Sequence, residues 1–356
     1  MNFKERIDKV RNLILNLQLD AALISSPYNK FYLGDLLSSS GYIFITKDNQ
    51  YIMVDSRYFE EVKSKNKNCK VILLTSDNTI EKALNHLIVI ENLHQIGFEG
   101  NEVSFDFYNF LKESLSCSLS SINLSKIRMI KEVEEINNIK IACNIADITF
   151  NHISKYIQAG MSERKIENEL VRFIKEQGGQ KESFDSIVAS GVRGALPHGK
   201  ASDKIIKKGE LITLDFGVKY NNYCSDITRT IALGNCQKEL VHVYQVVKAA
   251  GEEAMRNARP NLSVGELDNI ARNLICRSGY GEYFGHNLGH GLGIQVHEYP
   301  DVKTSSTELL KEGMVITIEP GIYLPKVGGV RIEEDVLITT EGCEKLTNSS
   351  RELIVI

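Results

Sequence analysis

The sequence lacks three features that mark particular classes of protein. No apolar run approaches the roughly 20 residues that a membrane-spanning helix needs. Basic residues are not in excess, since 42 lysines and arginines face 46 acidic residues and the formal net charge is −4. The residues from Met1 to Arg6 are charged and lack the apolar core of a signal peptide. We therefore expect no membrane partner and no nucleic-acid partner.

The seven cysteines form no CxxC pair and are scattered along the chain. This pattern is typical of free thiols in a reducing compartment rather than of a disulfide framework. Together with the missing signal peptide, it predicts a cytoplasmic protein.

Hydrophobic periodicity over the first third of the chain alternates between helix and strand. A helix is expected over 1–18, and strands 42–45 and 51–54 form an expected hairpin. The remaining expected elements are strands at 21–25, 70–74 and 95–98 and helices at 78–91 and 104–115. They predict a small α/β domain over 1–125.

A charged helical stretch with i,i+4 pairs begins near Met129 and marks a second domain over 126–356. Its expected helices lie at 133–158, 162–178, 238–257 and 264–277. Strands rich in glycine and β-branched residues lie between and after them. This order predicts an α+β domain built on an antiparallel sheet.

Two segments of the second domain resemble each other at an offset of 104 residues. They are KGELITLDFG (208–217) and EGMVITIEPG (312–321), and Asp215 and Glu319 occupy the same place in each. Such a duplication would deliver two carboxylates from equivalent strands to a shared centre.

Asp215 interrupts an apolar strand, where an ionised carboxylate needs a partner. Tyr220-Asn221 suits a two-residue turn, because asparagine tolerates positive φ. A hairpin pivoting there places Asp215 directly opposite Asp226, with Cβ atoms about 5 Å apart. Like charges that close destabilise a strand pair unless a cation lies between them. The pair therefore indicates a metal site, although solvated acids beside a turn would give the same pattern.

Histidines and further carboxylates cluster in the same domain. Three of the eight histidines (His286, His290 and His297) lie within twelve residues of a glycine-rich segment, and His198 precedes Gly199. A lone histidine is more often structural, but clustering beside glycines, which allow close backbone approach, favours ligands.

Glu319 ends an apolar strand, and strand alternation puts Arg331, Glu333 and Asp335 on one face of another. Parity alone does not choose between Glu333 and Asp335 as a ligand.

Taken together, these segments resemble the pita-bread metallopeptidases, specifically their aminopeptidase P and prolidase branch. The resemblance covers essentially the whole chain and includes NKFYLG (29–34), VDSRY (54–58) and FDSIVASG (184–191). It implies a pita-bread catalytic domain, creatinase- and aminopeptidase-like, over 126–356. It also implies a smaller creatinase-like α/β domain over 1–125.

The resemblance implies five metal ligands: Asp215, Asp226, His290, Glu319 and Glu333. Asp226 and Glu333 would bridge two metal ions, Asp215 would complete one site, and His290 with Glu319 would complete the other. Glu333 is thereby selected over Asp335. The histidines at 198, 286 and 297 match those that surround the metals and face the substrate. Arg331 matches an arginine that orders the site.

One histidine and four carboxylates form an oxygen-rich site that favours Mn²⁺, with Co²⁺, Zn²⁺ and Fe²⁺ as alternatives. Two metal ions about 3.5–4 Å apart can hold a bridging water and lower its pKa toward neutrality. Glu319 would accept the proton. His297 or His198 would stabilise the oxyanion together with one metal ion.

The resemblance further implies a homodimer and substrates that are peptides with proline in the second position. A strict dipeptidase must bind the free carboxylate of its product proline, commonly through an arginine between His297 and Glu319 in prolidases. Only Lys303 and Lys311 carry positive charge in that segment. This departure favours an aminopeptidase over a dipeptidase.

Three other functions fit the pattern less well. Methionine aminopeptidases share the five ligands but usually lack an amino-terminal domain of this size. Creatinase shares the two-domain layout but not the ligands. Non-catalytic peptide-binding relatives typically lose ligands, whereas all five are present here. We therefore expect an Xaa-Pro aminopeptidase, with an Xaa-Pro dipeptidase as the nearest alternative.

Overall fold

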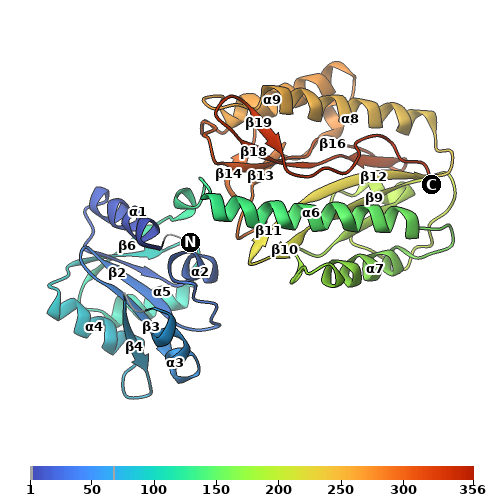
Figure 1. Ribbon diagram of the computed structural model, residues 1–356. Helices are drawn as coiled ribbons and strands as arrows, with labels where there is room; N and C mark the ends of the chain where they lie inside the picture. Colours follow the sequence, from blue (N-terminus) through green and yellow to red (C-terminus); the bar gives the residue numbers. More distant parts are fainter. Residues whose placement is uncertain (1–2, 67–68) are drawn as a thin grey trace. The chain divides into compact units, whose positions relative to one another are not determined.

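The computed structural model describes residues 3–66 and 69–356. The chain divides into an amino-terminal unit, Met1–Ile127, and a carboxy-terminal unit, Arg128–Ile356 (Figure 1). The first helix, α1, spans Phe3–Asn16, and residues 1 and 2 of the helix expected over 1–18 lie outside the described part. Within the described ranges, no helix combines the length and apolar character needed to cross a membrane.

The amino-terminal unit contains one six-stranded sheet in the order β4-β3-β2-β1-β5-β6. Only β2 runs antiparallel to its neighbours, and it forms the expected hairpin with β3. Side chains of Ser26, Asp55 and Ser104 cap the first turns of α2, α3 and α5. The elements are β1 (Ala21–Ile24), α2 (Pro27–Gly34), β2 (Tyr42–Thr46), β3 (Gln50–Asp55), α3 (Ser56–Lys65), β4 (Lys70–Leu74), α4 (Ile80–Ile90), β5 (Gln95–Glu99), α5 (Phe105–Ser114), β6 (Ser118–Ile122) and the 3₁₀ turn η1 (Ser125–Ile127).

The carboxy-terminal unit repeats one arrangement twice: two helices followed by three principal strands. The first half contains α6 (Val133–Tyr156), α7 (Glu163–Glu176), β8 (Ile187–Ser190), β9 (Glu210–Phe216) and β12 (Ile227–Leu233). The second contains α8 (Lys238–Asn257), α9 (Val264–Arg277), β13 (Gly289–Gly291), β15 (Val315–Ile318) and β18 (Glu334–Ile338). In each half the second strand lies between the other two, and these pairings are antiparallel, as expected.

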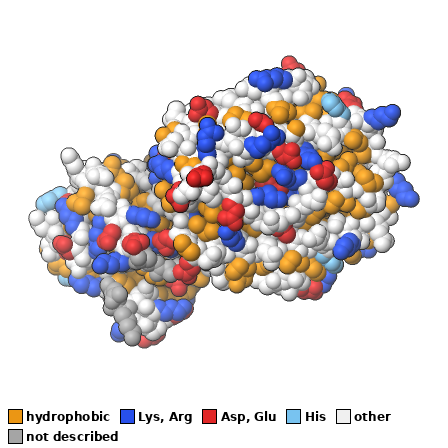
Figure 2. All heavy atoms as spheres, turned by 45° about the horizontal axis from the view of Figure 1, so that its top comes forward, with side chains coloured by type: hydrophobic (Ala, Val, Ile, Leu, Met, Phe, Trp, Pro, Cys, Tyr) orange, Lys and Arg blue, Asp and Glu red, His pale blue; other side chains and the backbone are white. Residues whose placement is uncertain are grey.

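Smaller elements complete this unit. They are β7 (Lys181–Glu182), η2 (Gly191–Ala195), β10 (Val218–Tyr220), β11 (Tyr223–Cys224), η3 (Gly281–Tyr283), β14 (Glu298–Val302), β16 (Gly321–Leu324), β17 (Gly328–Arg331) and β19 (Cys343–Lys345). Acidic, basic and apolar side chains are interspersed on the faces shown in Figure 2, consistent with the nearly balanced composition.

Each half has its own apolar core. Side chains of α6 and α7 pack with those of β8, β9 and β12, whereas α8 and α9 pack with β15 and β18. The helix pairs lie on opposite sides of the strands in Figure 1. The repeated sequence segments form β9 and β15, and each strand follows a glycine with positive φ, Gly209 (90°) and Gly313 (85°). The repeat seen in the sequence is therefore also a repeat of backbone conformation.

The predicted turn at Tyr220-Asn221 is wrong by one residue. The turn residues are Asn221 and Asn222, with φ of 45° and 68°. A two-residue turn of this kind needs positive φ at both positions, which asparagine tolerates better than tyrosine. The shift changes the register, so Asp215 lies opposite Thr228 and not opposite Asp226.

A buried arginine joins the two halves. Arg229 of β12 is 1 % exposed, and its Nη2 donates to Glu334 Oε1 of β18 at 2.8 Å and to the Ser349 carbonyl at 2.9 Å. Its Nη1 donates to the Glu333 carbonyl at 2.6 Å. This network fixes β12 against the segment that carries Glu333.

We predict that Arg229→Ala lowers the free energy of unfolding by roughly 3 kcal/mol, because it leaves the buried Glu334 carboxylate without its closest cation. Urea unfolding followed by circular dichroism measures the change. Arg277→Ala, an exposed arginine of α9, is the control and should change stability by less than about 0.5 kcal/mol. Equal stability of the two variants would contradict a structural role for Arg229.

Candidate metal centre

One cavity of about 600 Å³ in the carboxy-terminal unit is lined by every candidate site residue predicted from the sequence. Residues of both halves line it. The nine are Asp215, Asp226, His290, Glu319, Glu333, His198, His286, His297 and Arg331.

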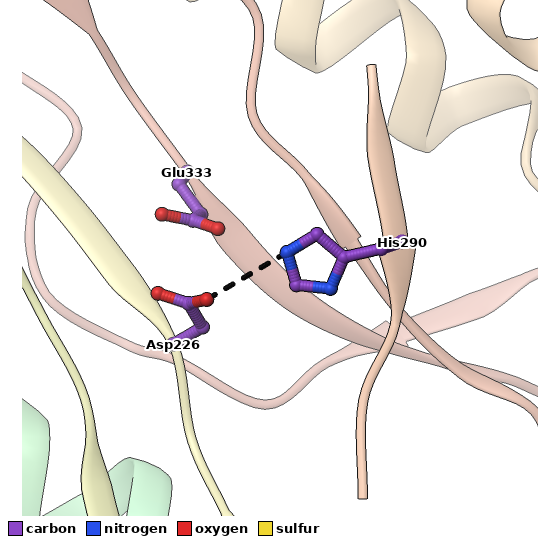
Figure 3. Close-up of side chains that lie close together, drawn as sticks. All are labelled: Asp226, His290 and Glu333. Carbon is purple, nitrogen blue, oxygen red and sulfur yellow. Dashed lines mark ion pairs between the residues drawn. The ribbon is translucent and has the colours of Figure 1, made fainter. Parts of the chain in front are cut away.

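Three of these side chains point toward one another (Figure 3). Asp226, His290 and Glu333 each offer one ligand atom, and these atoms lie within 4.8 Å of one another. Asp226 precedes β12, His290 lies in β13, and Glu333 lies between β17 and β18. Both halves of the unit therefore contribute to this group.

The imidazole of His290 is oriented for ligation. Its Nδ1 lies 3.0 Å from the Gly291 carbonyl, which accepts a hydrogen bond from Nδ1–H in the neutral tautomer. The other nitrogen, Nε2, then faces Glu319 Oε1 at 3.3 Å and Asp226 Oδ2 at 3.8 Å. A lone pair aimed at two carboxylates requires a proton or a metal ion between them.

Asp215 is held by Arg331, whose Nη2 donates to Asp215 Oδ2. The Nε of Arg331 donates to Thr228 Oγ1 at 3.1 Å, and this hydroxyl donates to Glu333 Oε2 at 2.6 Å. Thr228 is the cross-strand partner of Asp215. One threonine thus links the arginine to a second candidate ligand.

Electrostatics make the group unfavourable without a cation. Asp226 is 4 % exposed and Glu333 is 2 % exposed. Burial, followed by the charges of neighbouring carboxylates, raises the pKa of both groups well above their usual values. Within the described part of the chain, Asp226 Oδ1 is buried and has no hydrogen-bond partner. An unsatisfied buried oxygen among oxygen-rich donors fits a divalent metal ion.

Asp335 lies behind the site rather than in it. It does not line the cavity; its Oδ2 accepts from the Asp226 backbone N–H at 2.8 Å and lies 3.3 Å from Cys143 Sγ. Burial raises the pKa of Asp335 to about 7. Glu333 therefore lines the cavity, whereas Asp335 lies outside it and holds the backbone of Asp226 in place.

The three remaining histidines differ in their surroundings. Arg331 Nη1 donates to the Tyr323 hydroxyl at 2.7 Å, which in turn lies 2.8 Å from His286 Nε2. His286 is thus part of a hydrogen-bonded chain, whereas His198 and His297 are exposed on loops at the cavity. The ring of His297 lies 4.3 Å from that of His290. Although part of its side chain is exposed, partial desolvation of the imidazole at the cavity, followed by the charge of His290, lowers the pKa of His297.

Two known protein families match the two parts of the chain. The model of metallopeptidase family M24 matches residues 137–340, more than half of the chain. The chain belongs to this family. A creatinase/prolidase N-terminal domain matches residues 6–130. This M24 member is therefore a hydrolase of the metallopeptidase class, and the expected two-domain pita-bread fold is confirmed.

Relatives of this M24 member match along almost their entire lengths. A Xaa-Pro dipeptidase of Pyrococcus furiosus is 39% identical over 99% of this chain and 100% of its own. The structure of a Xaa-Pro dipeptidase from Bacillus anthracis has a TM-score of 0.97 and 37% identity, with 100% of both chains covered. That of an X-Pro aminopeptidase from Thermotoga maritima has a TM-score of 0.88 and 35% identity, covering 95% of this chain and 98% of that one.

The structure adds residues that sequence reasoning missed. Thr228 and Tyr323 connect Arg331 to Glu333 and to His286, and Lys200 and Asp185 also line the cavity. For Thr228 the signal was present, because the correct turn would have placed it opposite Asp215. Lys200 follows His198 by two residues, but nothing in that spacing indicates which way its side chain faces.

We predict that Asp226→Asn raises the melting temperature of the chelated, metal-free protein at neutral pH, since it removes one charge from the buried cluster. Adding Mn²⁺ should raise the melting temperature of the wild type and leave that of the variant almost unchanged. Thermal unfolding with and without Mn²⁺ measures both effects. An equal response of the two proteins to Mn²⁺ would contradict a ligand role for Asp226.

Proposed function

We propose that this metallopeptidase hydrolyses the peptide bond between an N-terminal residue and a following proline. The observation that carries the proposal is the convergence of the four candidate carboxylate ligands and four histidines on one cavity. The similarity to enzymes named Xaa-Pro dipeptidase and X-Pro aminopeptidase supports the choice of bond. The domain boundary between 125 and 126, the cytoplasmic location and the homodimer expected from the sequence belong to the same proposal.

Two divalent metal ions would be held by Asp215, Asp226, His290, Glu319 and Glu333, with Asp226 and Glu333 shared between them. Four carboxylates and one imidazole favour Mn²⁺, with Co²⁺, Zn²⁺ or Fe²⁺ as alternatives. When bound, such a pair supplies Lewis acidity and lowers the pKa of a coordinated water.

Glu319 is the proposed proton acceptor. Its Oε1 receives a hydrogen bond from Thr317 Oγ1 at 3.2 Å and lies 3.3 Å from His290 Nε2. In the absence of a metal ion, the hydrogen bond and charge of a protonated His290 hold the pKa of Glu319 below its usual value, although burial opposes this. Glu319 is therefore ionised at neutral pH and can take a proton from the attacking water and pass it to the leaving nitrogen.

His198 and His297 are the proposed donors to the peptide. The lowered pKa of His297 keeps its ring neutral at pH 7, so that it donates an N–H without adding charge to the site. A donor aimed at the carbonyl oxygen stabilises the negative charge that develops there. His286 is engaged with Tyr323 and is better placed to hold Arg331 and its carboxylate in position.

Dipeptides are the substrates we propose first. The missing arginine between His297 and Glu319 favours an aminopeptidase, and the Thermotoga maritima structure keeps that as the second candidate. However, Lys303 and Lys311, the cations of that segment, do not line the cavity, whereas Lys200 does. Of the three relatives compared, two are named Xaa-Pro dipeptidase.

The proposed function is tested with Ala-Pro, Ala-Pro-Ala and Met-Ala-Ser, using enzyme that has been chelated and then resupplied with Mn²⁺. We expect release of alanine from Ala-Pro that depends on the metal. Cleavage of Ala-Pro-Ala with equal or greater efficiency would make the enzyme an aminopeptidase. Release of methionine from Met-Ala-Ser alone would replace the proposal with a methionine aminopeptidase.

We further predict that His198→Ala lowers kcat by roughly 100-fold, the scale of one lost transition-state hydrogen bond, while metal content stays within error of the wild type. Turnover of the peptide that the wild type cleaves and metal analysis of the same preparation provide the two measurements. Loss of metal together with activity would place His198 among the ligands instead.

A further inference from the structure

We propose that Lys200 binds the free carboxylate of the substrate and so selects dipeptides over longer peptides, an inference that rests on the proposed function. Among the described residues that line the cavity, Lys200 and Arg331 are the lysines and arginines. The guanidinium of Arg331 is buried and already engaged by Asp215, Tyr323 and Thr228. Lys200 is therefore the cation available to a substrate.

The strand register places Lys200 beside the metal centre. Lys200 forms an antiparallel bridge with Ile187, and Ile187 is the antiparallel partner of Asp215. Directly opposite residues of an antiparallel pair project to the same face, so the three side chains share one face, and all three line the cavity. Two strand spacings put the Lys200 backbone about 10 Å from that of Asp215.

This separation suits an Xaa-Pro dipeptide. Its carboxylate lies one residue beyond the scissile bond, which is about 3.5 Å of extended chain. The four-carbon stem of the lysine can extend from the segment bridged to β8 toward that position. A longer peptide has an amide where the dipeptide has its charge, and the lysine gains no ion pair from it.

Hydrogen bonds to Glu163 and Arg193 hold the backbone that carries Lys200 in place. Glu163 is 0 % exposed, and it accepts from the backbone N–H groups of Ser190 at 2.9 Å and Ser202 at 3.1 Å. Arg193 pairs with Glu163 and donates through Nη2 to the Lys200 carbonyl at 2.7 Å. The segment 190–202 is thus fixed at both ends by hydrogen bonds to Glu163. This limits the conformational entropy that it loses when a substrate binds.

The side chain of Lys200, in contrast, is only loosely engaged. Its Nζ lies 2.7 Å from Asp185 Oδ2, and both side chains are exposed, at 73% and 74%. Exposed ion pairs contribute little to stability, so Lys200 can exchange Asp185 for a substrate carboxylate. Asp185 then acts as a competitor that keeps the ammonium at the cavity when no substrate is present.

The chain offers a matched control in Lys303. Its Nζ lies 2.8 Å from Asp301 Oδ2, and its side chain is 41% exposed. Like Lys200 it is an exposed lysine paired with an aspartate that lines the cavity, but Lys303 itself does not line it.

The test compares Ala-Pro with its amide, Ala-Pro-NH₂, which has the same scissile bond but no carboxylate. Metal-loaded wild type should cleave Ala-Pro with a kcat/KM about 10-fold higher, as expected for one hydrogen bond between charged groups. Lys200→Met should lose this preference through a lower kcat/KM for Ala-Pro alone. Lys303→Met should retain it. Asp185→Asn should increase it, because the competing carboxylate is gone.

Two results would overturn the proposal. The first is a wild type that cleaves both peptides equally, and the second is a Lys200→Met variant that keeps the preference of the wild type. Either would leave the proposed function intact, since Ala-Pro would still be cleaved. Cleavage of neither peptide by metal-loaded wild type would instead refute the proposed function, and the role of Lys200 with it.

Discussion

The main physical constraint on the carboxy-terminal unit is that several carboxylates lie close together in a buried cluster. Asp226 and Glu333 face each other with almost no exposure to water, and their mutual repulsion opposes folding. The surrounding network limits this repulsion: Arg331 neutralises Asp215, Thr228 binds Glu333, and Asp335 fixes the Asp226 backbone. The negative charge that remains favours a cation among these carboxylates.

Much of the fold was predictable because the helices and strands follow from local sequence patterns such as apolar periodicity. The helices of the carboxy-terminal unit lie where apolar periodicity predicts them, and α8 and α9 cover the expected ranges. The register of β9 and β12 was predicted wrongly, since the choice between Tyr220-Asn221 and Asn221-Asn222 as the turn residues depends on backbone conformation and not on composition. The error of two positions preserved strand parity. Asp226 therefore remained on the side of Asp215 and still reached the cavity.

For the candidate site, the residues could be predicted from the sequence, but the contacts between them could not. Carboxylates that interrupt apolar strands and histidines beside glycines are visible without a structure, and all nine named residues reach one cavity. The contact between Arg331 and Asp215 was not visible, and neither was the supporting ion pair of Arg229 with Glu334, because each connects residues more than 100 positions apart. Strand parity could not separate Glu333 from Asp335. Their different positions are seen in the structure, where Glu333 lines the cavity and Asp335 accepts a hydrogen bond from the Asp226 backbone.

The repeat within the carboxy-terminal unit has a thermodynamic consequence. Asp215 and Asp226 belong to the first half, whereas His290, Glu319 and Glu333 belong to the second. An ion bound by ligands from both halves acts as a reversible cross-link between them, so its binding energy contributes directly to their association. By reciprocity, any change that loosens the halves weakens ion binding by the same free energy. Metal affinity in such a protein is therefore also a measure of how firmly its two halves are joined.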